Sequence, residues 1–257
     1  MSRLSIPPDT VVLPPAQSFF LEGSNDSVVI LFHGFTGITR EMRPVGEKLA
    51  EHGFSVSAPR LPGHGTNGED LLATNHHHWI RRGVDEYLEC AGRYRRVFVG
   101  GLSMGGLIAT VVAGQFPVAG LLLYAPAFVL FDRRVPLTPY LGIVVPRIPR
   151  QHEPEHEDPD LRAIEDAYMH YEWVRPAGHL RRLQLSARRA LPSVRCPTLL
   201  VVSPEDRTVP LSVRGHILSR IGGATEVVEL SSSGHVVTND DERDRVAEET
   251  VRWIRER

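Results

Sequence analysis

The sequence predicts an α/β protein built on a doubly wound, mostly parallel sheet. Short apolar runs alternate with longer helical patterns along the chain, which is typical of this class. Most of the runs are apolar at consecutive positions, as in strands that are buried on both faces. The chain has 257 residues, of which 42% are hydrophobic and 23% charged. This size and composition are typical of one globular domain, so we expect a single domain over residues 1–257.

Strands and helices are expected in turn along the chain. The expected strands are Val28–Phe32, Ser55–Ala58, Arg96–Gly100, Ala119–Tyr124, Thr198–Ser203 and Thr225–Leu230. The expected helices are Thr39–His52, His76–Gly92, Met104–Phe116, Leu211–Ile221 and Asp240–Arg255. Thr10–Leu13 and Phe19–Leu21 are candidates for an antiparallel edge that precedes the parallel strands.

Residues 127–191 interrupt this alternation. The segment begins apolar and proline-rich, becomes acidic, and then carries two helical patterns, Asp160–Trp173 and Ala177–Ala190, without a convincing strand. A structureless connection of this length is uncommon in a compact domain. We therefore predict a small helical cap inserted into the core. An ordinary crossover with irregular helices is the alternative.

The charge balance and the N-terminus exclude several classes of function. A net charge of −2 provides no basic field for nucleic acid or for an anionic membrane. Prolines interrupt the apolar residues before Phe19, so no export signal is expected, and no segment approaches the roughly 18 apolar residues of a membrane span. The two cysteines, Cys90 and Cys196, are too far apart in sequence for a CxxC pair. We expect a cytoplasmic protein without stable membrane insertion; the sequence does not indicate its oligomeric state.

Ser103 is the candidate nucleophile. It lies in a G-x-S-x-G motif at residues 101–105, directly after the expected strand Arg96–Gly100 and directly before the expected helix Met104–Phe116. A nucleophile elbow requires this strand–turn–helix setting, because the serine occupies a strained turn that flanking glycines permit. A glycine-rich turn with a passive serine is the alternative interpretation.

Asp206 and His235 are the candidate acid and base. Each follows one of the last two expected parallel strands, and the carboxyl ends of parallel strands meet at one edge of a sheet. A serine hydroxyl needs a base, and that base needs an acid to orient it. Glu205 is the main competitor of Asp206 for the acid role. Alone, Asp206 could cap a helix and His235 could be a surface histidine.

Backbone N–H groups are expected to form an oxyanion hole. One donor is the N–H of Met104, the residue after the nucleophile. The other is the N–H of Phe35, in the H-G-F-T-G loop at residues 33–37 that follows strand Val28–Phe32. A turn that needs its glycines only for backbone reasons is the alternative.

These motifs resemble those of α/β-hydrolases, and more narrowly of the bacterial carboxylesterase and monoacylglycerol lipase group. The matching segments, in order, are His33–Gly37, Gly63–Gly65, Gly101–Gly106, Asp206–Pro210 and Ser233–Val236. They span most of the chain, and they are specific as a set rather than singly. The resemblance implies hydrolysis of monoacylglycerols or of short- to medium-chain monoesters through an acyl-enzyme, without cofactor or metal. It is least informative for the inserted segment.

Two other functions remain open from the sequence. An acyltransferase would use the same three residues and differ in the acceptor of the acyl group. A non-enzymatic binding member of the fold would normally lack one of the three residues, so the intact set disfavours it. The expected partner is a small-molecule ester.

The apolar residues of the inserted segment are candidates for substrate binding. Ile143, Val144 and Val145 lie in a stretch that prolines break repeatedly, so it cannot form one long core helix. Such a stretch must cover something or form an exposed apolar patch. We therefore predict that it lines an acyl-chain pocket above Ser103. Packing of the cap onto the core is the alternative.

Three further motifs resemble cofactor or metal sites but lack the structural setting that such sites need. G-x-G-x-x-G at 63–68 does not follow a strand directly, as a dinucleotide-binding turn must. H-E-x-x-H at 152–156 contains Pro154, which disfavours the helix that a zinc site needs. His76–His78 is expected to be the exposed start of a helix rather than a metal site.

Overall fold

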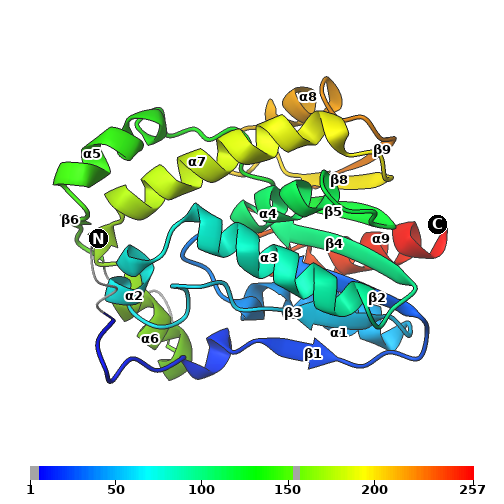
Figure 1. Cartoon of the computed structure of the whole chain (residues 1–257), viewed down its shortest axis with the longest axis horizontal. Coiled ribbons are helices and arrows are strands. Elements are labelled where there is room, and N and C mark those ends of the chain that lie inside the picture. Colours follow the sequence, from blue (N-terminus) through cyan, green and yellow to red (C-terminus); the bar gives the residue numbers. More distant parts are fainter. Residues whose placement is uncertain (1–5, 153–156) are drawn as a thin grey trace.

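The structure, a computed structural model, describes residues 6–152 and 157–257 and places the predicted strands in one sheet (Figure 1). This sheet has seven strands in the order β1-β3-β2-β4-β5-β8-β9. The strands are β1 (Phe19–Leu21), β2 (Ser27–Phe32), β3 (Ser55–Ala58), β4 (Arg96–Leu102), β5 (Gly120–Tyr124), β8 (Thr198–Val202) and β9 (Thr225–Glu229). Strand β1 pairs antiparallel with β3, and all the other neighbours are parallel. The predicted fold class is confirmed.

Helices cover both faces of the sheet. Helices α1 (Arg43–Glu51) and α9 (Arg243–Arg255) pack together on one face. The other face carries α3 (His76–Ala91), α4 (Met104–Ala113), α7 (Val174–Ala190) and α8 (Val213–Leu218). A short helix α2 (Gly68–Ala73) precedes α3, and single 3₁₀ turns lie at Pro14–Ala16, Thr39–Met42, Val135–Leu137 and Leu191–Ser193.

The buried side chains form two hydrophobic clusters, one on each face of the sheet. In β2, Val28, Ile30 and Phe32 join the cluster under α3, α4 and α7, whereas Val29 and Leu31 join the cluster under α1 and α9. Successive side chains of a strand point to opposite faces. A strand covered on both faces can therefore be apolar at consecutive positions, as β2 is from Val28 to Phe32, which explains the runs seen in the sequence.

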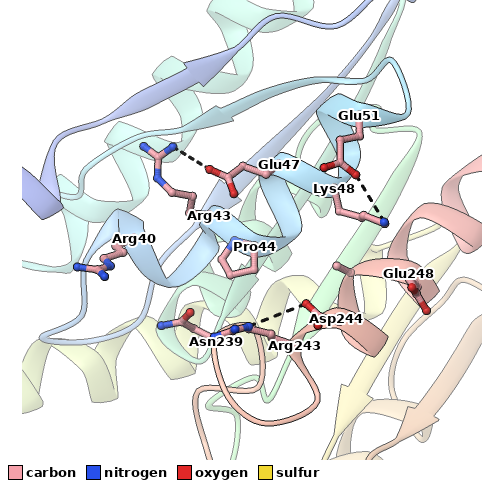
Figure 2. Close-up of a pocket in the computed structure, with 11 residues that line it drawn as sticks. Arg40, Arg43, Pro44, Glu47, Lys48, Glu51, Asn239, Arg243, Asp244 and Glu248 are labelled. Carbon is pink, nitrogen blue, oxygen red and sulfur yellow. Dashed lines mark hydrogen bonds and ion pairs between the residues drawn. The ribbon is translucent and has the colours of Figure 1, made fainter.

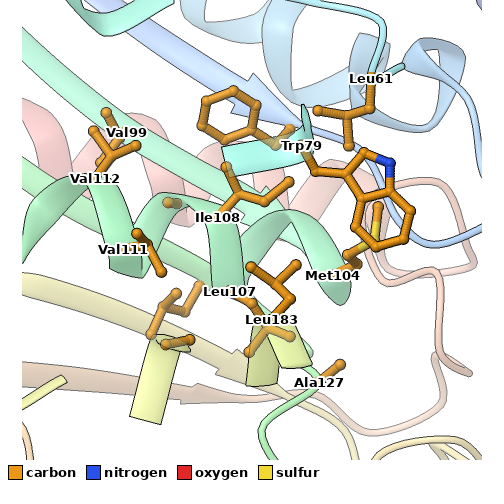
Figure 3. Close-up of a cluster of buried hydrophobic side chains, with 14 of the residues drawn as sticks. Leu61, Trp79, Val99, Met104, Leu107, Ile108, Val111, Val112, Ala127 and Leu183 are labelled. Atoms are coloured by element: carbon orange, nitrogen blue, oxygen red, sulfur yellow. The ribbon is translucent and has the colours of Figure 1, made fainter. Parts of the chain in front are cut away.

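Helix α4 lies at the centre of the larger cluster. All ten of its residues are buried, and its side chains meet Trp79 of α3 and Leu183 of α7 (Figure 3). Full burial of one leucine or isoleucine side chain stabilises a fold by about 1.5–3 kcal/mol. A helix enclosed in this way holds its first residue, Met104, and the preceding Ser103 in fixed positions.

Two of the expected elements near the N-terminus differ from the structure. The single helix expected over Thr39–His52 is a 3₁₀ turn followed by α1, which begins at Arg43 because Pro44 fits only the first turn of a helix. Thr10–Leu13 is not a strand, so this expectation was wrong. The Leu13 N–H donates instead to the Gly65 carbonyl, in the loop before α2.

Helices α8 and α9 are shorter than expected. Helix α9 begins at Arg243 rather than at Asp240, because the carboxylates of Asp240 and Glu242 bind backbone N–H groups of the preceding loop. Helix α8 covers only Val213–Leu218 of the expected Leu211–Ile221. Helix α4 likewise ends at Ala113, followed by Gly114.

Residues 127–191 contain helices, as expected, and a small sheet, which was not expected. The elements in order are α5 (Thr138–Val144), β6 (Ile148–Pro149), α6 (Pro159–Tyr168), β7 (Tyr171–Glu172) and α7. Strands β6 and β7 pair antiparallel over two residues each, too short a run for any period to be detected in the sequence. Helices α5 and α6 lie beyond the carboxyl ends of the parallel strands, at the left of Figure 1. Within the described residues, no helix has the length and apolar character needed to cross a membrane.

Candidate active site

Ser103 forms a sharp turn between β4 and α4. Its backbone has φ +52° and ψ −110°, outside the conformations that a side-chain-bearing residue ordinarily adopts. The turn is held on both sides, because the Ser103 N–H donates to the Tyr124 carbonyl at 2.9 Å and the Ser103 carbonyl accepts from the Ala127 N–H at 3.2 Å. The side chain thus occupies a position fixed by β5 and the residues that follow it.

The two glycines of the motif are required by close backbone approaches. A Cβ on Gly105 would lie 2.0 Å from the Phe32 carbonyl oxygen, and one on Gly101 would lie 2.4 Å from the Gly105 carbonyl carbon. Both neighbouring atoms belong to the backbone, so neither can move aside without distorting the fold. The glycines therefore allow α4 to start directly against the end of β2.

His235 lies between Ser103 and Asp206. Its Nε2 is 2.9 Å from Ser103 Oγ, and its Nδ1 is 2.7 Å from Asp206 Oδ2. A carboxylate can only accept, so Nδ1 carries the proton and Nε2 is left to accept the serine hydroxyl proton. The Asp206 side chain is 2% exposed, and its other oxygen accepts the N–H groups of Thr208 and Val209 at 2.7 and 2.8 Å. Glu205, the competing acid in the sequence, is exposed.

The loop that carries His235 is held by two carboxylates from the start of α9. Glu242 Oε2 accepts the N–H groups of Ser231, Ser232 and Ser233 at 2.7, 2.8 and 3.2 Å. Burial alone would raise the pKa of Glu242, but these hydrogen bonds and one from Arg245 lower it to about 2. Asp240 accepts the Gly234 N–H at 2.6 Å. The sequence placed these two residues in the first turn of the expected helix Asp240–Arg255 and gave no sign of this contact.

The two expected oxyanion donors lie beside Ser103. Met104 begins α4 directly after Ser103, and Phe35 follows Gly34, whose Cβ position would be 3.8 Å from Ser103 Cβ. Within the described part of the chain, neither the Phe35 N–H nor the Met104 N–H has an acceptor among the recorded hydrogen bonds. Both donors are therefore available to a ligand.

Buried histidines support the Phe35 loop from behind. His33 donates from Nδ1 to the Gly34 carbonyl at 2.9 Å and accepts the Leu61 N–H at Nε2, at 3.1 Å. Burial, with a smaller contribution from His64, holds the pKa of His33 well below its usual value, so the ring is neutral. The ring of His64 packs edge-on against His33, Phe35 and Trp79. The G-H-G motif at 63–65 marks this packing, which the sequence alone did not reveal.

The expected substrate-binding residues lie at the end of α5, in different environments. Val145 lines a hollow of about 390 Å³ together with Leu141, Ile148 and Trp173. Ile143 and Val144 are 73% and 83% exposed and do not line it. Charged side chains of Asp132, Arg134, Arg150 and Glu172 also line this hollow, which otherwise has an apolar wall.

A second hollow lies between α1 and α9 (Figure 2). It measures about 510 Å³, and charged side chains line most of it. Its four basic side chains each have an acidic partner: Arg40 pairs with Asp158, Arg43 with Glu47, Lys48 with Glu51 and Arg243 with Asp244. Neither Ser103 nor His235 lines either hollow, and the mostly charged lining of this second one does not fit an apolar acyl chain.

Two of the three remaining sequence motifs lie wholly within the described residues. The G-x-G-x-x-G segment is a loop with positive φ at Gly63 and Gly65 that is separated from β3 by several residues. His76 begins α3 and stacks on His179 of α7. Residues 153–156 of H-E-x-x-H lie outside the described residues. Over 6–152 and 157–257, no group of three or more histidine, cysteine or acidic side chains is arranged to hold a metal ion.

Comparison with known proteins agrees with this geometry. The model of the alpha/beta hydrolase family matches residues 29–249, which include Ser103, Asp206 and His235. This chain belongs to the alpha/beta hydrolase family. A thermostable monoacylglycerol lipase of a Bacillus species is 32% identical over 95% of this chain and 96% of its own, and a carboxylesterase of Bacillus subtilis is 28% identical over 89% and 92%.

Solved structures agree with the family and with the fold. A structure from a study of two metagenome-derived lipolytic enzymes, LipS and LipT, is 29% identical to this hydrolase with a TM-score of 0.84, and the match covers 96% of this chain and all of the other. The monoacylglycerol lipase of Paleococcus ferrophilus has a TM-score of 0.75 at 20% identity, covering 92% and 97% of the two chains. At 20% identity, the similarity to the Paleococcus ferrophilus lipase shows only a shared fold.

Proposed function

We propose that this hydrolase cleaves carboxylic esters through an acyl-enzyme formed on Ser103. The observation that carries the proposal is the pair of short contacts made by His235, at 2.9 Å to Ser103 Oγ and at 2.7 Å to Asp206 Oδ2. A serine, a base and an acid in this arrangement form the standard apparatus of acyl transfer. The lipase and esterase names of its relatives at 32% and 28% identity support an ester as the substrate.

In the proposed mechanism, Ser103 Oγ attacks the ester carbonyl carbon while His235 Nε2 takes the hydroxyl proton. Asp206 stabilises the resulting imidazolium, and the N–H groups of Phe35 and Met104 donate to the oxyanion. Collapse of the tetrahedral intermediate releases the alcohol, which takes the proton from His235. Water then attacks the acyl-enzyme with His235 as base, the carboxylic acid leaves, and Ser103 regains its proton.

The substrate class we propose is a monoester with an apolar acyl chain, such as a monoacylglycerol. In support, the hollow of about 390 Å³ lies within residues 127–191, for which we propose the role of a cap, and has an apolar wall that includes Val145. The sequence also assigned Ile143 and Val144 to the acyl chain. Their high exposure makes them the appropriate comparison for Val145. The cytoplasmic location expected from the sequence stays a prediction.

The proposal is tested by measuring hydrolysis of monoacylglycerols and p-nitrophenyl esters of increasing acyl length. We expect turnover that is abolished by Ser103→Ala, with a loss on the order of 10⁶ in kcat, while the variant stays folded. Glu205→Gln, an exposed neighbour of Asp206, is the control and should retain most of the activity. A folded Ser103→Ala protein with more than a few per cent of wild-type turnover would contradict the proposal.

Added acceptors separate hydrolysis from acyl transfer by the same residues. The reaction is run with free alcohol or thiol present, and the products are analysed. Carboxylic acid as the main product supports the hydrolase. A transferred acyl group as the main product at low acceptor concentration would favour an acyltransferase instead, and the absence of any turnover or labelling would favour a binding protein.

A further inference from the structure

A carboxyl group that the mechanism does not use lies against the loop that carries Phe35. Glu41, in the 3₁₀ turn Thr39–Met42, accepts the N–H of Gly34 at Oε2, at 3.3 Å. A Cβ on Gly37 would lie 2.2 and 2.4 Å from the two carboxyl oxygens of Glu41. The side chain therefore fills the concave side of the loop from Gly34 to Gly37, and the loop in turn carries a proposed oxyanion donor.

The same carboxyl group is close to the nucleophile. The point at which a side chain on Gly34 would begin is 3.6 Å from Glu41 Oε2 and 3.8 Å from Ser103 Cβ. Glu41 Oε2 and Ser103 Cβ thus both lie within van der Waals distance of one point beside Gly34. Apart from the chain neighbours His33 and Phe35, no described residue has an atom nearer to that point.

Charged groups around Glu41 are mostly paired with others. Arg40, on its own turn, pairs with Asp158, and Arg43 at the start of α1 pairs with Glu47. His33 at the end of β2 is neutral because of its burial. Burial raises the pKa of Glu41 to about 7, although the N–H groups of Gly34 and Ile38 and the charge of His235 lower it. His235, in the loop after β9, is hydrogen-bonded to Asp206, and its protonated form is a cation whose charge favours the ionised form of Glu41.

We propose that Glu41 is a positioning residue whose carboxylate form anchors the Gly34–Gly37 loop and stabilises the protonated state of His235. The inference rests on the proposed function, because it concerns the base of that reaction. Interaction between two charges is reciprocal: if His235 favours the ionised form of Glu41, then ionised Glu41 favours the imidazolium that forms when Ser103 loses its proton. The anion also strengthens the hydrogen bond from the Gly34 N–H.

This arrangement makes turnover depend on the ionisation of Glu41 as well as on that of the base. Below about pH 7 Glu41 is increasingly protonated, so His235 loses a nearby negative charge and the loop loses a charge-assisted hydrogen bond. The acid limb of the pH profile of kcat/KM should therefore be steeper than one ionisation predicts. Turnover should level off only above about pH 8.

Glu41→Gln tests the proposal because glutamine keeps the shape and an oxygen acceptor for Gly34 while removing the charge. We expect the midpoint of the acid limb to move to lower pH by about half a unit or more, and the limb to follow a single ionisation. The plateau of kcat/KM should fall by about three- to tenfold, since His235 becomes a weaker base. Glu47→Gln, on the exposed side of α1, is the matched control and should leave the profile unchanged.

The outcomes distinguish this inference from the proposed function. An acid limb of Glu41→Gln that superimposes on that of the wild type, after scaling for plateau height, would overturn the role of Glu41 while the ester hydrolase stands. Wild-type protein without ester turnover would overturn the proposed function itself. If Glu41→Gln unfolds at the assay temperature, Glu41→Asp replaces it: a carboxylate that no longer reaches Gly34 should lower the plateau and leave a two-step acid limb, and an unchanged plateau would contradict the proposal.

Discussion

Replacing Asp206 by asparagine should disable His235 without removing a side chain. Asp206 uses one oxygen for the His235 Nδ1–H at 2.7 Å and the other for the N–H groups of Thr208 and Val209 at 2.7 and 2.8 Å. Asparagine has only one acceptor oxygen. If that oxygen stays with the two backbone N–H groups, the amide NH₂ faces His235 and imposes the tautomer with its proton on Nε2.

In that tautomer His235 can no longer accept the proton of Ser103. We expect kcat to fall by about 10⁴, as in other serine enzymes that lose control of the tautomer. In the opposite orientation, the N–H groups of Thr208 and Val209 would face the amide NH₂ and have no acceptor. Each unsatisfied buried donor costs about 1–3 kcal/mol of stability. The asparagine should therefore adopt the inactivating orientation, with a small change in unfolding free energy.

The assay compares kcat of Asp206→Asn with that of Glu205→Gln on a p-nitrophenyl ester, alongside urea unfolding of both variants. Glu205 is adjacent in sequence and exposed, so its variant should stay within about twofold of the wild type. A larger loss for Glu205→Gln than for Asp206→Asn would refute the reasoning. So would an Asp206→Asn protein that keeps more than a tenth of wild-type kcat.

Three further outcomes are expected. Gly105→Ala should lower the free energy of unfolding in urea by more than about 2 kcal/mol. Gly215→Ala should not, because a Cβ on Gly215 meets no atom within 4 Å. Equal effects of the two substitutions would contradict the geometry of the turn at Ser103. Glu242→Gln should lower unfolding free energy at pH 7. Because the pKa of Glu242 in the folded protein is about 2, below its ordinary value of 4.5, this difference should shrink as pH falls from 4.5 toward 2; a constant difference would contradict the prediction. In the wild type, kcat/KM should rise with acyl length by up to about fourfold per methylene. Val145→Asp should flatten this rise more than Val144→Asp does. Equal profiles for the two variants would contradict binding of the acyl chain in the hollow.

Much of the fold could be predicted because local pattern and tertiary position agree. Strand β2 is apolar from Val28 to Phe32 because two clusters bury its two faces, and such a run is a clear signal in the sequence. Element ends were less predictable where a side chain has a tertiary role. The carboxylates of Asp240 and Glu242 look like the first turn of a helix, yet they bind the loop before His235, so α9 starts later.

The candidate site could be predicted to the extent that it lies at strand ends. Ser103, Asp206 and His235 each follow a parallel strand, so topology alone brings them to one edge. Glu41 had no such signal, because its position against Gly34 depends on the turn before α1. Ile143 and Val144 show the opposite limit: an apolar run does not tell which of its residues face a hollow and which face solvent.

Covalent labelling of the nucleophile tests the central claim most directly. The wild-type protein is incubated with a fluorophosphonate, digested, and analysed by mass spectrometry for the position and stoichiometry of the adduct. The account predicts one adduct per chain, on Ser103, with no labelling of Ser103→Ala and slow labelling of Asp206→Asn. An adduct on another residue, or a Ser103→Ala protein that labels as fast as the wild type, would contradict it.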